Sequence, residues 1–251
     1  MSRNGFLIAI EGLEHSGMQR IGERLSGKLR HKGYKSSFGA EPVVSPFQNY
    51  FREATRENTL ALVDSAVSIL GFADLSGSVD SVNLYQRICW IIDDFNLGKK
   101  LSATDLQVLS LFERKFNLRT VVKDMVSCGG FLVLKGYELG SLAAGLSTGI
   151  SFEELFCLQK EVLEDDYIRP DVTILIDTPL REYQNYLSRN GLAELTLDES
   201  QKVALGYEIA ASGLQRGFNY GFVLRVGGGK TEGLVFADIL RKLSRFIPAL
   251  A

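Results

Sequence analysis

A glycine-spaced loop near the amino terminus has the spacing of a phosphate-binding loop. The sequence IEGLEHSGMQR follows a short apolar run, residues 6–10, and precedes a stretch with helical spacing. In the pattern G-x-x-x-x-G-K-[ST], the glycines let backbone N–H groups approach phosphate oxygens, the lysine adds positive charge and the hydroxyl holds Mg²⁺. Here Gly12 and Gly17 occupy the glycine positions, but Met18 and Gln19 occupy the lysine and hydroxyl positions.

The loop by itself leaves two interpretations open. It could still bind phosphate, because backbone N–H groups and a helix N-terminus suffice for an anion. Equally, it could be a tight strand-to-helix turn without a ligand. Neither Met18 nor Gln19 replaces a cation, and losing one preorganised donor costs about 3–4 kcal/mol, or roughly 10²–10³ in rate. The sequence of the loop alone favours neither interpretation.

The segments that must position this loop alternate between strand-like and helix-like patterns. Strands are expected at residues 6–10, 34–38, 131–134, 171–177 and 222–226, and helical spacing is clearest at 19–32 and 231–246. Thr231 is a candidate cap for the last helix. Short buried strands separated by helices predict an α/β fold with a five-stranded parallel sheet and helices on both faces. In such sheets, ligands bind at the carboxyl ends of the strands.

Residues 52–109 interrupt this alternation and contain no convincing strand. Segments 58–70 and 83–97 have helical character, so we expect a helical insertion within a single domain that spans residues 1–251. The second segment is almost continuously apolar, with Tyr85, Ile88, Trp90, Ile91, Ile92 and Phe95. These side chains either pack on the parent domain or form an interface for a homodimer or another protein.

A second glycine-rich loop, GGGKT at residues 227–231, also lies between a strand and a helix. The complete phosphate-binding pattern needs a glycine five residues before Gly229, and that residue is Leu224. A flexible turn is therefore the favoured interpretation of this loop.

The overall composition is typical of one large globular domain. The 251 residues carry a formal net charge of −2 at pH 7, with basic residues scattered among acidic ones, which argues against a nucleic-acid or membrane surface. The three cysteines and two histidines lack zinc-ligand spacing and favour reduced thiols in a cytoplasmic protein. We expect neither a signal peptide nor a transmembrane span, since no apolar run approaches roughly 18 residues.

Taken together, the motifs resemble the thymidylate kinase family of P-loop nucleoside-monophosphate kinases. The resemblance rests on FLIAIEGLEHSGMQRIGERLSGKLRHKGY at the amino terminus, AEP after the second strand, RPDVTILIDTPL at residues 169–180 and VALGYEIA at residues 203–210. It covers roughly residues 3–50 and 108–247. It implies that the predicted sheet is of the P-loop NTPase type and belongs to a kinase that binds ATP and Mg²⁺ and transfers the γ-phosphate to dTMP.

The resemblance also implies which residues form the two substrate sites. The phosphate loop would comprise Gly12, Glu14, Ser16, Gly17, Met18 and Gln19, and the monophosphate site would comprise Glu41, Arg114, Asn117 and Tyr137. Arg114 matches the family's phosphate-binding arginine. Ser110 replaces its base-stacking phenylalanine, and Phe112 lies on a different helical face.

Several charged groups of the family are missing from this chain. Its Asp-Arg-Tyr motif becomes Lys135-Gly136-Tyr137, and the aspartate that helps the magnesium shell is thereby replaced by a lysine. The family's lid arginines are absent from residues 190–202, and Arg189 is the nearest survivor. Because phosphoryl transfer depends mostly on positioning and charge neutralisation, these losses are cumulative.

Two functional hypotheses follow. The first is a non-catalytic thymidylate kinase-like protein, or pseudokinase, with a binding, regulatory or assembly role and no confident catalytic residue. The alternative is an active dTMP kinase in which Lys135 or Lys230 replaces the loop lysine, with ATP and Mg²⁺ as cofactors. In that case Arg189 would support transfer, and Glu14, Glu41 and Asp177 are the candidate ligands for Mg²⁺.

Overall fold

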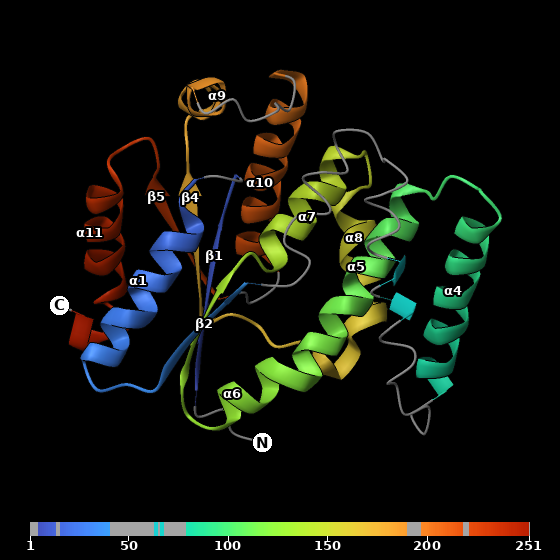
Figure 1. Cartoon of the computed structure of the whole chain (residues 1–251), viewed down its shortest axis with the longest axis horizontal. Coiled ribbons are helices and arrows are strands. Elements are labelled where there is room, and N and C mark those ends of the chain that lie inside the picture. Colours follow the sequence, from blue (N-terminus) through green and yellow to red (C-terminus); the bar gives the residue numbers. More distant parts are fainter. Residues whose placement is uncertain are drawn as a thin grey trace.

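Five parallel strands form a central sheet that has helices on both faces (Figure 1). The computed structural model describes residues 5–13, 16–40, 63–64, 66–67, 79–189, 197–217 and 221–250. The strand order is β2-β3-β1-β4-β5. The strands are β1 (Phe6–Gly12), β2 (Ser36–Ala40), β3 (Phe131–Lys135), β4 (Val172–Asp177) and β5 (Phe222–Gly227). This sheet confirms the predicted α/β class and is consistent with a P-loop NTPase-like fold.

The helices connect and cover these strands. They are α1 (Met18–His31), α4 (Val79–Asn96), α5 (Ala103–Asn117), α6 (Lys123–Ser127), α7 (Glu138–Ser147), α8 (Phe152–Leu163), α9 (Leu180–Arg189), α10 (Leu197–Gly217) and α11 (Glu232–Leu243). A π-helical segment (Leu118–Val122) joins α5 to α6, and short 3₁₀ turns cover Glu164–Asp166 and Pro248–Leu250. Thr231 does precede α11, as expected, but its side chain makes no capping hydrogen bond.

The central strand β1 is buried on both sides because its side chains alternate between two apolar clusters. Ile8 and Ile10 pack in a cluster with residues of α1 and α11. Leu7 and Ala9 point to the opposite face, where they join a cluster built largely from α4, α5, α8 and the π-helical segment. A third cluster on that face joins α7 and α10 to the end of β4. The loop that follows β1 is therefore held by a strand fixed on both faces.

Helix α1 begins directly after the loop, and Gly17 makes this possible. Gly17 adopts a left-handed conformation with φ 89° and ψ 7°, which favours glycine because a Cβ atom is strained there. The first turn of α1 contains no acidic residue, whereas Lys28, Arg30 and His31 lie in its last turn. The helix dipole therefore remains positive at the end that faces the loop.

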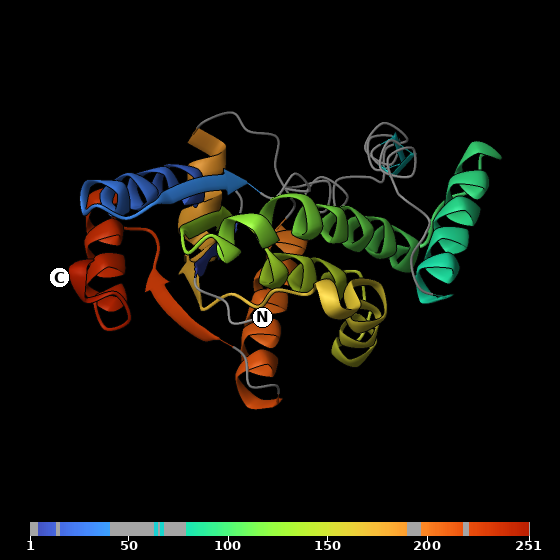
Figure 2. The same ribbon diagram turned by 90° about the horizontal axis from the view of Figure 1, so that it is seen from below.

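The expected insertion is represented by α4 and the beginning of α5, which lie at the edge of the molecule farthest from α11 (Figure 2). Helix α4 covers most of the expected segment 83–97, whereas most of 58–70 lies outside the described residues. Ile88, Ile92 and Phe95 are buried in the same cluster as α5, so this side of α4 packs on the parent domain. Trp90 is 66% exposed. Because α5 runs through Leu109, the expected insertion boundary falls inside a helix.

Because α7 and α10 are in close contact at Gly206, we predict that a larger residue at this position destabilises the fold. A Cβ atom added there would lie 2.4 Å from the backbone oxygen of Ala143. We expect Gly206→Ala to lower the free energy of unfolding by about 1–3 kcal/mol, because the two helices must separate. The matched control is Gly27→Ala on α1, where an added Cβ meets no atom within 4 Å.

Gly27→Ala should raise the free energy of unfolding by roughly 0.5–1 kcal/mol, because alanine is the better helix former. Urea unfolding followed by far-UV circular dichroism measures both changes. Equal effects of the two substitutions would contradict the close α7–α10 contact.

Candidate functional site

An open cavity of about 760 Å³ lies beside the glycine-spaced loop. Its walls come from the loop and α1, the end of β3, the segment after β4, α9, and the segment from the end of β5 into α11. The lining residues include Ser16, Gly17, Met18, Gln19, Lys135, Thr178, Glu182, Arg189, Lys230 and Glu232. The cavity therefore occupies the carboxyl edge of the parallel sheet, where ligands of such folds bind.

The two residues that replace the lysine and hydroxyl of the phosphate-binding pattern do not supply these groups. Met18 is only 4% exposed and packs with Ile21 and Leu25 in an apolar cluster. Gln19 lies on the surface of α1, where its side-chain nitrogen donates to the carboxylate of Glu23. Neither substituted side chain therefore brings a positive charge into the cavity.

Ser16 brings a hydroxyl to the same loop. Its Oγ atom is buried and has no hydrogen-bond partner among the residues that the structure describes. A Cβ atom added at Gly12 would lie 3.0 Å from this oxygen and 2.8 Å from the backbone oxygen of Ile176. Gly12 has φ 154°, a conformation that L side chains rarely adopt. Both facts explain why this loop needs glycine at position 12.

A buried carboxylate fixes the strand end from which the loop starts. Glu11 is 1% exposed and accepts hydrogen bonds from the backbone N–H groups of Leu139 (3.0 Å) and Gly140 (3.2 Å) at the N-terminus of α7. Tyr207 of α10 donates to the backbone oxygen of Gly12 at 2.8 Å. The sequence analysis did not single out Glu11. The available signal was an acidic residue at the end of an otherwise apolar strand, because such a charge needs buried partners.

Three basic candidates from distant parts of the chain converge on the cavity. Lys135 comes from the end of β3, Arg189 from the end of α9, and Lys230 from the loop after β5. Arg20 of α1, which the sequence analysis missed, also lines it. Arg20 could have been predicted from sequence, because it is a basic residue in the first turn of the helix that follows the loop.

The four basic side chains face two acidic ones, Glu182 and Glu232. Glu232 is paired with Arg24 at 2.7 Å and lies 3.9 Å from Arg20. Among the lining residues that the structure describes, positive charge is therefore in excess and, together with the helix N-terminus, attracts anions. The glycine-rich loop at residues 227–231 forms one wall of this cavity.

The three described candidates for the monophosphate site, Arg114, Asn117 and Tyr137, lie in a different region. Arg114 is 3% exposed, donates to the backbone oxygen of Tyr137 at 2.6 Å, and has its guanidinium 5.3 Å from the centre of the Tyr137 ring. Tyr137 donates in turn to the backbone oxygen of Ile168. Asn117 has a buried side-chain nitrogen without a hydrogen-bond partner among the described residues. None of these three candidates is among the described residues that line the cavity.

The same region contains a buried carboxylate, Glu138, at the first turn of α7. It accepts hydrogen bonds from the side-chain nitrogen of Gln159 and from the hydroxyl of Tyr167. Burial raises the pKa of Tyr167 well above its ordinary value, so this phenol stays protonated and remains a donor. Arg114, Tyr137 and Glu138 thus belong to a polar network that joins α5, α7 and α8.

Of the three residues expected to hold Mg²⁺, only Asp177 lies in the part of the chain that the structure describes. Asp177 ends β4 as an exposed residue outside the described cavity lining, and its backbone oxygen accepts from Gly228 N. Glu14 and Glu41 lie outside the described residues. In the ranges that the structure describes, no three His, Cys, Asp or Glu side chains gather closely enough to hold a metal ion.

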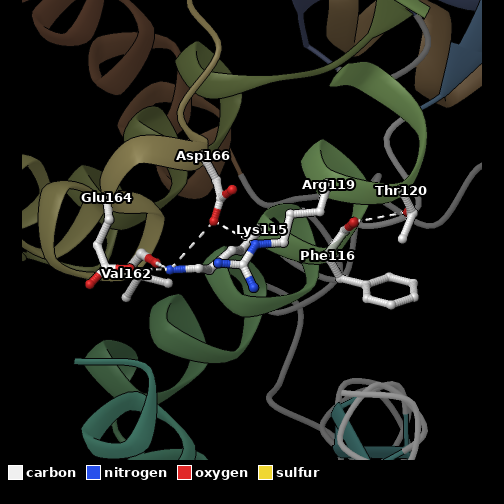
Figure 3. Close-up of polar contacts among 7 residues, drawn as sticks. All are labelled: Lys115, Phe116, Arg119, Thr120, Val162, Glu164 and Asp166. Carbon is white, nitrogen blue, oxygen red and sulfur yellow. Dashed lines mark hydrogen bonds and ion pairs between the residues drawn. The ribbon is translucent and has the colours of Figure 1, made fainter. Parts of the chain in front are cut away.

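A further charged cluster ties α5 to the end of α8 (Figure 3). Lys115, which is 4% exposed, donates to the backbone oxygen of Val162 at 2.8 Å and to Glu164 at 2.6 Å. Arg119 donates to Asp166 at 2.6 Å, and Asp166 also lies 3.7 Å from Lys115. Glu164 has φ 46°, an uncommon conformation for a residue with a side chain. The cluster therefore holds a strained turn in place at the end of α8.

No family model matches the chain, and no curated protein matches its sequence. The resemblance to thymidylate kinases therefore rests on the quoted motifs. Over the described ranges, each helix is too short or too polar to span a lipid bilayer.

Substitution of the buried lysine should destabilise the fold much more than substitution of its exposed neighbour. Lys115→Ala removes the donor of Val162 and the buried partner of Glu164, and breaking such a pair costs about 3–5 kcal/mol. Arg119→Ala removes a pair whose arginine is 53% exposed, and this costs about 1 kcal/mol or less. Chemical unfolding monitored by circular dichroism gives both values. Similar losses for the two variants would refute the structural role of Lys115.

Proposed function

We propose that this protein binds a nucleotide through its phosphate groups in the cavity beside the glycine-spaced loop, and that it transfers phosphoryl groups poorly or not at all. The observation that carries the proposal is the meeting of this loop with Lys135, Arg189 and Lys230 around one cavity. It would thus be a thymidylate kinase-like protein whose role is binding, regulation or assembly in the cytoplasm, alone or with a second copy or another protein.

The shape and charge of the cavity suit a nucleotide. Gly17 directs the positive end of α1 toward the loop, and basic side chains lie on the other walls. The volume, about 760 Å³, falls within the range of roughly 300–1,000 Å³ that is common for small-molecule sites. Phosphate groups would therefore meet backbone N–H groups on one side and cations on the other.

The same cavity is poorly equipped for transfer. The loop carries Met18 in the core and Gln19 on the surface, so the donor phosphates lack the usual lysine beside them. Arg114, which the resemblance assigns to the acceptor phosphate, is buried and donates to the backbone oxygen of Tyr137. A single catalytic arginine is worth roughly 10³–10⁵ in rate, so its engagement elsewhere weakens any acceptor site.

One observation favours the second candidate, an active kinase. Lys135 and Lys230, the two lysines that could replace the missing one, both line the cavity. Lys135 comes from the end of β3 and Lys230 from the loop after β5. Neither therefore belongs to α1, where the lysine of the usual pattern would lie. In that case the reaction would depend on at least one of them.

ADP should bind the folded protein and raise its thermal midpoint, because a ligand that binds only the native state stabilises it by mass action. Lys230→Ala removes a charge at the cavity and should weaken ADP binding about tenfold, the effect of one charged hydrogen bond. Lys123→Ala, which removes an exposed lysine of α6, is the matched control and should leave the affinity unchanged. Calorimetric titration gives each dissociation constant. Equal weakening by both variants would point to general charge effects and not to this cavity.

A coupled assay with ATP, Mg²⁺ and dTMP should show turnover at or below about 10⁻² s⁻¹, roughly 10²–10⁴-fold under the usual 1–100 s⁻¹ of kinases. Turnover should be slow because Met18 and Gln19 occupy the positions of the loop lysine and the loop hydroxyl residue, so neither group is supplied there. Turnover in the usual range would overturn the non-catalytic proposal. In that event, Lys135→Ala and Lys230→Ala identify the replacement lysine, and activity unaffected by either would exclude both.

A further inference from the structure

The position of Lys135 is fixed by the strand that carries it. It is the last residue of β3, its Cα pairs with that of Ile10 in β1, and the next residue, Gly136, donates to the backbone oxygen of Ile10 at 2.8 Å. Gly136 has φ 70°, so the chain turns away immediately after the lysine. Lys135 therefore stands beside the strand that leads into the glycine-spaced loop, and it lines the cavity.

In P-loop proteins, much of the phosphate charge is neutralised by a magnesium ion held by a loop hydroxyl and a strand-end aspartate. Magnesium requires several oxygen ligands in octahedral geometry and usually one or two carboxylates. In the resemblance to thymidylate kinases, the aspartate that helps this shell falls at the position of Lys135. An ammonium group at that position repels a divalent cation and attracts the phosphates themselves.

The other described oxygen donors around the cavity do not compensate for this lysine. Glu232 is already paired with Arg24. The carboxylate of Glu182 lies so close to Gly229 that a Cβ atom added there would be 1.4 Å from its oxygen. Ser16 and Thr178 each offer one neutral hydroxyl oxygen, Asn185 offers an amide oxygen, and Gln19 is turned toward Glu23. In the described part of the chain, no three His, Cys, Asp or Glu side chains gather closely enough to hold a metal ion, and a lysine stands at the strand end where the resemblance places the metal-shell aspartate.

We infer that Lys135 takes the place of the metal ion, so that the cavity binds the phosphates of a nucleotide as the metal-free anion. This inference rests on the proposed function and adds the ionic form of the ligand and the residue that selects it. Lys135 is better placed for this than Lys230 or Arg189, because it is half-buried on a strand end while the other two are exposed. Partial burial strengthens its attraction to a phosphate, since water screens the charges less.

The inference is tested by calorimetric titration of the full-length protein with ADP, once in EDTA and once in excess Mg²⁺. The expected result is binding in EDTA that is as tight as, or up to about tenfold tighter than, binding in Mg²⁺. Lys135→Ala should weaken binding in EDTA by about tenfold or more, and Lys135→Arg should restore most of it, because the charge returns. Circular dichroism and the thermal midpoint establish that each variant is folded.

A reversal of the metal dependence is the sharpest expected result. Lys135→Asp replaces the cation with a carboxylate, so binding in EDTA should be lost and Mg²⁺ should improve it. Lys123→Asp on α6 makes the same charge change away from the cavity and should preserve the wild-type pattern.

The outcomes separate the inference from the proposed function. Wild-type binding that is at least tenfold tighter in Mg²⁺ than in EDTA would overturn the inference and leave nucleotide binding intact. Wild-type affinity in EDTA that is unchanged in a folded Lys135→Ala variant would also overturn it. Absence of binding in both conditions would overturn the proposed function itself.

Discussion

The hydrogen bonds between the buried carboxylate of Glu11 and the N-terminus of α7 are the interaction on which the rest of the site depends. A charge taken out of water is tolerated only where donors replace the lost hydration, and here two backbone N–H groups and the helix dipole do so. The contact fixes β1 against α7 one residue before Gly12, whose backbone oxygen is held by Tyr207 of α10. The loop therefore starts from a rigid point, even though Met18 and Gln19 stand where the phosphate-binding pattern has a lysine and a hydroxyl residue.

This rigid frame explains how binding and transfer can be separated. In the proposed function, the backbone that would approach phosphate is set by Gly12, Gly17 and the beginning of α1, none of which needs a lysine. Positive charge reaches the cavity instead from the end of β3, the end of α9 and the loop after β5. Charges in these positions attract an anion over a broad surface, whereas transfer requires them within a narrow geometry around one phosphoryl group.

The sheet was predictable from sequence, because four apolar runs and the more polar segment 34–38, all bounded by glycine or proline, coincide with the five strands within a few residues. The cavity was predictable in part, since Lys135, Arg189 and Lys230 follow or flank elements that end at one edge of the sheet. The hydrogen bond from Arg114 to the backbone oxygen of Tyr137 could not be predicted, because the two residues are far apart in sequence. The role of Glu11 could not be predicted, because a single acidic residue in a strand does not indicate which N–H groups will donate to it.

The placement of Trp90 has a consequence for spectroscopy. It is the single tryptophan of the chain, it lies on α4 at the periphery, and its ring is largely solvated in the native state. A solvated indole emits at nearly the same wavelength in folded and unfolded chains. Tryptophan emission therefore reports on the surroundings of one peripheral helix and changes little when the sheet unfolds.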